Sequence, residues 1–183
     1  DERMLELVKD GNIKYKELLE KIRTDYKKAY DVIQLKHTTP YQKSLDYYDA
    51  LYAIYKDKDV PAYLERMKRY LASLGEDANG ADYASAAQSL YYAAASKLRP
   101  EDHRQAIAWL EKAIPGETVL MNKINYLVMV GDSYKELKDY ASARKYYNQA
   151  YAESLQLASM EQAQQVVQAS VTYKLATLEL LEK

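Results

Sequence analysis

Apolar residues recur at steps of three and four along almost the whole chain, the spacing of one face of an α-helix. The clearest early stripe runs from Ile13 to Ile33, and its members are Ile13, Leu18, Leu19, Ile22, Tyr26, Tyr30 and Ile33. The charged residues between them lie mostly off this stripe, so we interpret them as a solvated face. No stretch alternates apolar and polar residues in the way that a half-buried strand does. The pattern therefore predicts an all-α protein.

Helix-starting and helix-ending residues divide this pattern into segments. Thr39 before Pro40, and Asp59 before Pro61, predict two helix starts, and the second helix should run to about Leu74. The segment Gly75–Gly80 is the strongest break and the one boundary that we predict between two halves. After this break we expect helices near 81–98, 101–114, 117–138, 139–155 and 160–182. The predicted architecture is a series of antiparallel helix hairpins joined by short turns.

Two spacings of small and large residues repeat in the second half. Ala106-x3-Leu110-x2-Ala113 recurs 37 residues later as Ala143-x3-Tyr147-x2-Ala150. On the preceding helices, Leu127-x2-Val130-Gly131-x2-Tyr134 recurs 39 residues later as Val166-x2-Ala169-Ser170-x2-Tyr173. Small residues at a helix crossing let the neighbouring helix approach closely, and the large residue between them fills the remaining space.

These residues resemble the tetratricopeptide repeat (TPR), a helix–turn–helix unit of about 34 residues. The resemblance covers 87–118, 124–157 and, for a first helix only, 163–183. It implies that 81–183 forms a right-handed TPR-like array. Residues 1–75 should form degenerate or non-TPR hairpins, because Tyr63, Met67 and Tyr70 occupy a seam where small residues belong. We expect both parts to stack as one continuous unit, with an irregular helical bundle as the alternative.

The TPR resemblance also implies a binding surface, because the first helix of each pair lines the concave face of such arrays. Carried over position by position, it predicts a partner-binding face made of Gln88, Tyr91, Tyr92, Asn125, Val128, Met129, Asp132, Gln164, Val167 and Gln168. This lining is mainly apolar and uncharged, and it lacks the Lys/Asn/Arg cluster of chaperone-binding TPR proteins. We expect one partly exposed apolar patch on this face, made of Tyr91, Tyr92, Val128 and Met129.

Charge and cysteine usage narrow the classes of function. The 183 residues contain 26 Lys and Arg against 27 Asp and Glu, for a net charge of −1, which argues against nucleic acid as a partner. The apolar runs are too short for membrane insertion. Cysteine is absent, which excludes disulfides, thiolate nucleophiles and thiolate metal sites. There are twenty Tyr and no Phe, so we expect Tyr to replace Phe in packing; a tyrosine-lined groove is the alternative.

The sequence offers no constellation of residues for catalysis. His37 and His103 both flank predicted helix starts in polar surroundings, so we expect surface or capping roles for them and no metal site. The single Trp109 is expected to pack between repeats. We therefore predict no catalytic residue, no bound metal and no cofactor.

The predicted function is that of a scaffolding module, not an enzyme, which binds a protein or peptide segment. The alternative is a non-catalytic helical region of a larger enzyme. Tyr-rich hairpins with degenerate repeats are similar to regions that accompany thioredoxin-like oxidoreductases of the bacterial cell envelope. This resemblance implies a periplasmic or cell-envelope location, with the cytoplasm as the alternative. Because the sequence begins at Asp1, we expect a processed or trimmed chain.

Overall fold

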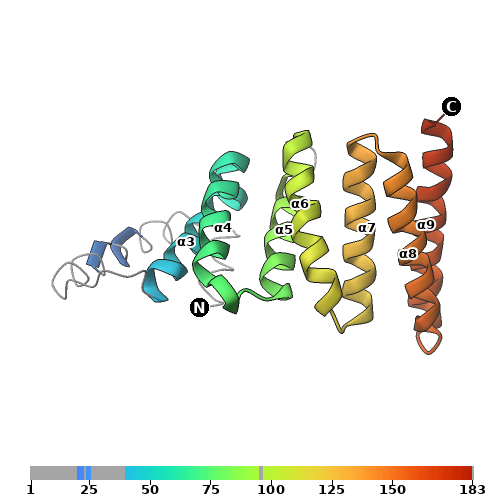
Figure 1. The fold of residues 1–183 in the computed structure, drawn as a ribbon, viewed down its shortest axis with the longest axis horizontal. Coiled ribbons are helices and arrows are strands. Elements are labelled where there is room, and N and C mark those ends of the chain that lie inside the picture. The colour runs from blue at the N-terminus through green and yellow to red at the C-terminus, as the bar shows by residue number, and fades with distance from the viewer. Residues whose placement is uncertain (1–19, 23, 26–39, 95–96, 183) are drawn as a thin grey trace. The chain divides into compact units, whose positions relative to one another are not determined.

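The computed structural model describes residues 20–22, 24–25, 40–94 and 97–182 (Figure 1). Every regular element in these ranges is a helix, and none of the described residues belongs to a strand. The prediction of an all-α protein is therefore confirmed. Of the predicted stripe between Ile13 and Ile33, Ile22 is the only member among the described residues, and it lies in the helical residues 20–22. The other members of the stripe lie outside the described residues, as does His37.

The chain divides into two compact units. Among the described residues, the first unit holds those up to 78 and also 92–94, and the second holds 79–91 and those from 97 onward. The first division falls after Ala78, inside the predicted break Gly75–Gly80. Gly75 has φ of +59°, a left-handed conformation that side chains disfavour, and it ends the preceding helix there.

The first unit is a helix hairpin made of α3 (Pro40–Tyr52) and α4 (Val60–Leu74), which pack against each other. A π-helical turn, Ala53–Asp57, widens the end of α3, and Lys58 reverses the chain with φ of +56°. The Asp59 carboxylate then accepts a hydrogen bond from the Ala62 N–H at 2.9 Å. The predicted helix start at Asp59 is therefore confirmed, with Asp59 as the N-cap.

Bulky side chains fill the seam of this hairpin. Tyr63 and Met67 of α4 are almost completely buried, together with Leu51 and Ile54. Tyr70 is half-buried, with its ring centroid 4.9 Å from that of Tyr47. The predicted departure from a small-residue seam is confirmed at Tyr63 and Met67. An ion pair adds a polar link between the helices, because Asp46 lies 3.1 Å from Arg69.

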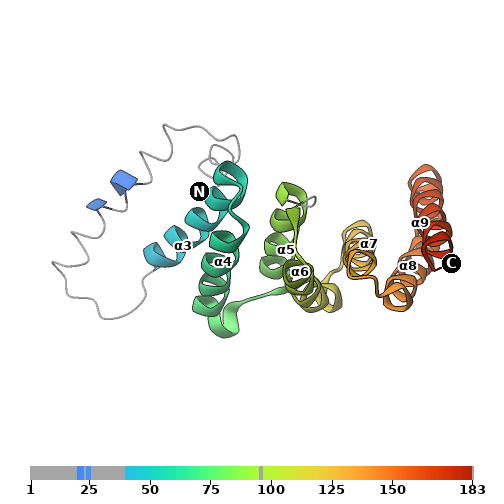
Figure 2. The same ribbon diagram turned by 90° about the horizontal axis from the view of Figure 1, so that it is seen from above.

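Among its described residues, the second unit contains α5, except for residues 92–94, and four further α-helices that stand side by side (Figures 1 and 2). Their bounds are α5 (Gly80–Ala94), α6 (Pro100–Ala113), α7 (Leu120–Glu136), α8 (Tyr140–Ser154) and α9 (Glu161–Leu181). These helices agree with the predicted ones to within a few residues at each end. Along the chain, α6 packs against α7, α7 against α8, and α8 against α9.

Side-chain caps explain where three of these helices begin. Before α5, the Asn79 carboxamide accepts a hydrogen bond from the Ala81 N–H at 2.8 Å, and Asp82 accepts one from the Asn79 N–H at 2.9 Å. Asp102 accepts one from the Arg99 N–H at 2.9 Å at the start of α6. Asp139 accepts one from the Ser142 N–H at 3.0 Å before α8. Such caps satisfy the otherwise unpaired amides of a first helical turn.

The seam between α7 and α8 is built from small residues around one tyrosine. Ala143 and Ala150 of α8 are fully buried, as the repeated spacing predicts, and Tyr147 between them is buried as well. The Tyr147 ring lies directly on Gly131 of α7: a Cβ added at Gly131 would stand 2.4 Å from the Tyr147 Cε1 atom. Gly131 therefore lets a complete aromatic ring fit between the two helix backbones.

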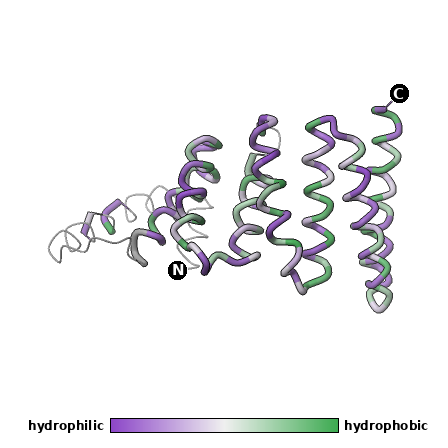
Figure 3. Tube along the Cα trace, viewed as in Figure 1, coloured by the Kyte–Doolittle hydropathy of each residue, from purple (hydrophilic) through white to green (hydrophobic). Residues whose placement is uncertain are grey.

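Hydrophobic and hydrophilic residues are interleaved along each of these helices (Figure 3), as expected where a helix buries one face. Trp109 of α6 is buried, which agrees with its predicted packing role. In the described part of the chain, no helix combines the length and apolar character needed to cross a bilayer.

Candidate interaction surfaces

The structure separates the ten residues of the predicted partner-binding face into exposed and packed positions. Tyr92, at 65% exposure, and Asn125 are exposed. Seven others are half-buried: Gln88, Tyr91, Val128, Asp132, Gln164, Val167 and Gln168. Met129 is only 4% exposed, so its predicted place in an exposed patch is wrong. The reason is that α7 packs against both α6 and α8, which leaves only a narrow exposed strip.

Three side chains from three helices meet at Asp132 of α7, and we call these four residues the Asp132 cluster. The Tyr147 hydroxyl of α8 donates a hydrogen bond to Asp132 Oδ1 at 2.6 Å, and the Lys174 ammonium of α9 donates to the same oxygen at 2.6 Å. The Tyr91 hydroxyl of α5 donates to Asp132 Oδ2 at 2.8 Å. One carboxylate on α7 thus joins α5, α7, α8 and α9.

The chemistry of the Asp132 cluster is that of a structural link. Three donors surround the carboxylate, and hydrogen bonds to a charged group are stronger than neutral ones. Burial raises the pKa of Tyr147, and its hydrogen bond to Asp132 raises that pKa further, so the phenol stays protonated as a donor. We therefore assign Asp132 and Tyr91 to helix–helix contact.

The sequence prediction selected Asp132 and Tyr91 for a surface but missed Tyr147 and Lys174 as their partners. One signal for Lys174 was present, since it is the only charged residue between 162 and 178 of α9. A solitary charge on such a helix indicates a buried or half-buried partner. Nothing comparable marks Tyr147, because nineteen other tyrosines compete for the role.

Two predicted surface residues of α9 also contribute to packing. The Gln164 carboxamide donates hydrogen bonds to the backbone carbonyl oxygens of Ser154 at 3.0 Å and Leu155 at 3.3 Å. These carbonyls lie at the end of α8, where helical partners are lacking. Val167 packs against the hydrophobic core that surrounds Tyr147. The face of α9 that the repeat pattern turns toward a partner is therefore turned largely toward α8.

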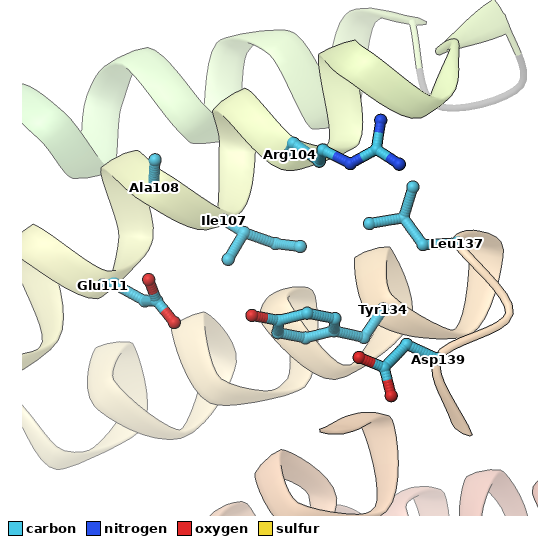
Figure 4. Close-up of a pocket in the computed structure, with 7 residues that line it drawn as sticks. All are labelled: Arg104, Ile107, Ala108, Glu111, Tyr134, Leu137 and Asp139. Carbon is cyan, nitrogen blue, oxygen red and sulfur yellow. The ribbon is translucent and has the colours of Figure 1, made fainter. Parts of the chain in front are cut away.

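A hollow of about 380 Å³ lies between α6 and α7 (Figure 4). Its lining residues are Arg104, Ile107, Ala108, Glu111, Tyr134, Leu137 and Asp139. The Tyr134 ring lies at its centre, with the hydroxyl directed toward Glu111. Burial raises the pKa of Tyr134, and the negative charges of Glu111 and Asp139 raise it further.

Both carboxylates of the hollow are already engaged. Glu111 accepts a hydrogen bond from the Tyr146 hydroxyl at 2.6 Å, and Asp139 accepts from the Ser142 hydroxyl at 2.7 Å as well as from its N–H. Tyr146 in turn stacks on Tyr134 with centroids 5.6 Å apart. These contacts therefore connect α6, α7 and α8 beside the hollow, and they do not form a nucleophile–base pair.

The predicted surface or capping role of His103 is wrong. This residue is only 6% exposed, and its Nδ1 atom has no hydrogen-bond partner among the described residues. Burial lowers the pKa of His103, while the nearby charges of Glu136 and Asp102 oppose this shift. The sequence placed His103 at a polar helix start but could not show that α7 packs on this side of α6. No metal-binding group of three His, Cys, Asp or Glu occurs in the described part of the chain.

The most exposed apolar surface of the second unit lies on α9, and we call it the α9 outer face. Its members are Val166, Ala169, Ser170, Tyr173, Ala176 and Leu180, all of which are exposed. Val166, Tyr173 and Leu180 keep 70%, 75% and 71% of their surface in contact with solvent. They follow one another at seven-residue intervals, so they share one side of the helix.

The α9 outer face is also free of charge. Between 162 and 178 the only charged side chain is Lys174, which is turned to Asp132 on the opposite side of the helix. That opposite side contains Val171 and Leu178, both fully buried. The helix is therefore apolar on two sides, and only one of them is covered within the described residues.

No family model, no curated protein and no solved structure matches this chain.

Proposed function

We propose that this chain is a protein-interaction module that binds a helix of a partner through the α9 outer face. We propose also that α5 to α9 stack in the manner of TPR repeats, with the pairs 87–113 and 124–150 as consecutive repeats. The single observation that carries the binding proposal is the charge-free row of Val166, Tyr173 and Leu180, exposed on a helix already anchored on its other side. Contiguous exposed apolar patches mark interaction sites.

The kind of partner follows from a comparison within the chain. The pattern Leu127-x2-Val130-Gly131-x2-Tyr134 on α7 recurs on α9 as Val166-x2-Ala169-Ser170-x2-Tyr173. On α7, Leu127, Val130 and Gly131 are buried, and Gly131 lies beneath the Tyr147 ring of α8. On α9, the corresponding residues are exposed. The partner of the α9 outer face is therefore a helix with the seam of α8, in which two alanines flank a large residue.

The size of this face sets the expected affinity. Burying a side chain such as Val166 or Leu180 stabilises a complex by about 1.5–3 kcal/mol. Association itself costs several kcal/mol in lost translational and rotational freedom. With three large anchors and no charged pair, the face supports binding of about micromolar strength.

A peptide that reproduces α8 provides the test. A labelled peptide of residues 139–155, held helical by a staple on its polar side, is titrated with the protein while fluorescence anisotropy is recorded. We expect saturable binding to the wild-type protein, and at least about a tenfold loss with Ala169→Glu, because the new carboxylate lies in the middle of the face. A control peptide with Tyr147→Ser in its sequence should not bind.

Thr172→Glu is the matched control variant, because Thr172 is exposed on the same helix but points to the side of the face. It should bind the peptide as the wild type does. Equal binding by Ala169→Glu would mean that the peptide uses another site, such as the native position of α8, and the proposed function would be wrong. Circular dichroism and Trp109 fluorescence confirm that each variant is folded.

A further inference from the structure

The α9 outer face carries both halves of a helix–helix seam. As a first helix it has the pattern Val166-x2-Ala169-Ser170-x2-Tyr173, which matches the pattern of α7. As a second helix it has Ala169-x3-Tyr173-x2-Ala176, which repeats the spacing Ala143-x3-Tyr147-x2-Ala150 of α8. The two patterns share Ala169 and Tyr173, so they lie on one side of one helix. A surface with both halves is complementary to itself.

The antiparallel contact between α7 and α8 supplies the register. There, Gly131 of α7 lies beneath Tyr147 of α8. Ser170 occupies the position of Gly131 in the first pattern, and Tyr173 occupies the position of Tyr147 in the second. Transferring the contact places Ser170 of one copy against Tyr173 of another, and the reverse pair forms at the same time. This reciprocity is the property of a two-fold symmetric interface.

The register also places large side chains opposite small ones along the whole face. In an antiparallel pair, each step forward on one helix is a step backward on the other, so the pair Ser170–Tyr173 fixes which residues lie opposite each other. Val166 then faces Thr177, next to Ala176, and Leu180 faces Ala163. Alternation of large and small residues lets ridges on one helix enter grooves on the other.

The charges of α9 agree with an antiparallel second copy. Within the face there is no charged side chain that would be desolvated. In this register Glu179 stands at the level of Gln164 of the other copy, whereas a parallel pair would place Glu179 at the level of its own counterpart. Glu179 and Glu182 are also paired with Arg144 within the same chain.

Building on the proposed function, we infer that the helix that covers the α9 outer face is the same face of a second copy of this chain, in an antiparallel α9–α9 dimer. One feature limits its strength. Gly131 has no Cβ and admits the Tyr147 ring at close range, whereas Ser170 has both a Cβ and a hydroxyl. The two α9 helices therefore stay further apart than α7 and α8. A contact one helix wide also lies at the small end of stable interfaces, so the dimer dissociates reversibly.

Sedimentation velocity of the 183-residue chain, from about 1 to about 500 µM, tests this inference. We expect the mass to rise with concentration from 21.1 kDa toward twice this value. Ala169→Glu should weaken the association at least about tenfold, Thr172→Glu should leave it unchanged, and Ser170→Gly should strengthen it by allowing closer approach. A chain that stays monomeric throughout, or a dimer that Ala169→Glu does not affect, would overturn the inference.

Cysteine cross-linking tests the orientation, because the natural chain has no cysteine. When Val166→Cys and Thr177→Cys proteins are mixed and oxidised, the antiparallel register predicts disulfide-linked heterodimers of the two variants. Preferred linkage of Val166→Cys with itself would indicate a parallel pair and overturn the register. If the chain is monomeric but binds the 139–155 peptide, only the second-copy inference fails. If it neither dimerises nor binds the peptide, the proposed function fails as well.

Discussion

The hairpin α3–α4 of the first unit and the hairpin α7–α8 of the second have the same plan but opposite seams. In each hairpin the second helix begins at an aspartate cap, Asp59 for α4 and Asp139 for α8, and is fifteen residues long. In the first unit the seam holds the large residues Tyr63 and Met67. In the second it holds alanines around Tyr147, whose ring lies on Gly131. Helical period and caps are therefore sufficient for a hairpin, whereas residue size sets how closely its helices approach.

This difference extends to the polar links. In the first unit, Asp46 forms an ion pair with the half-exposed Arg69 of the adjacent helix. In the second, close approach of α7 and α8 brings the Tyr147 hydroxyl to Asp132, where Tyr91 and Lys174 also donate. A small-residue seam thus allows one carboxylate to connect several helices.

The largest effect is expected from Met67→Ala in the first unit. Removal of this buried side chain leaves a cavity that the surrounding side chains fill only in part, so stability should fall by about 2–5 kcal/mol. Urea unfolding followed by circular dichroism measures the loss, and Glu65→Ala at an exposed site of α4 is the control. Trp109 fluorescence, which reports on the second unit, separates the responses of the two units. A loss below about 1 kcal/mol would mean that this seam is loosely packed.

In the second unit, Gly131→Ala should destabilise the protein by about 3 kcal/mol, because the added Cβ meets the buried Tyr147 ring. Elsewhere in a helix the same change is stabilising. Thermal unfolding followed by Trp109 fluorescence measures the effect. Gly116→Ala is the matched control, since no atom lies within 4 Å of a Cβ at this position.

A double variant sharpens this prediction. If the ring of Tyr147 is the cause, Gly131→Ala should cost much less in a Tyr147→Leu background than in the wild type. This non-additivity is the signature of two residues in direct contact. If Gly131→Ala alone increased the stability, this result would show that α7 and α8 do not approach closely.

The third prediction compares the polar links of the two units. Asp132→Asn removes the charge that receives Tyr147 and Lys174, and should cost about 1.5–3 kcal/mol. Asp46→Asn should cost less, because the Arg69 partner of Asp46 remains half-exposed to water. Urea unfolding measures both. Equal losses would contradict the view that the Asp132 cluster holds several helices together.

The two helix caps should differ by a smaller amount. Asp139 accepts hydrogen bonds from both the N–H and the hydroxyl of Ser142, and these bonds lower the pKa of Asp139. Asp59 accepts one bond from Ala62. Asp139→Ala should therefore lower the melting temperature by a few degrees, and by more than Asp59→Ala. The Asp139 contribution should be complete above its ordinary pKa and disappear as the pH falls through the lowered value; pH-dependent melting of the wild type and Asp139→Ala tests this.

The smallest effect concerns His103. Since burial lowers its pKa, the unfolded chain binds a proton more readily than the folded chain near the ordinary pKa of histidine. Stability should therefore be constant above about pH 7 and decrease as the pH falls below about 6.5. His103→Gln should reduce this slope when melting temperatures are compared between about pH 5 and pH 8. An unchanged slope would assign the pH dependence to other groups.

The sequence by itself determined the helices of the described region. Their limits follow from periodic apolar residues and from caps such as Asp59, Asp139 and the break at Gly75, all of which act within one or two helical turns. The alanine spacings also identified Ala143 and Ala150 as buried, because residue size at a helix crossing is itself encoded in the sequence.

Only the tertiary structure decided what each helix face meets. The residues that meet Asp132 lie 41 and 42 positions away at Tyr91 and Lys174, beyond the range of any local pattern. Met129 and His103 were misjudged for the same reason, since their burial depends on α6 and α7 packing together. Conversely, Val167 and Val166 are adjacent and equally apolar, yet α8 covers one and leaves the other exposed. Burial depends on the neighbouring helix as well as on the side chain, and the α9 outer face became visible only once that neighbour was in place.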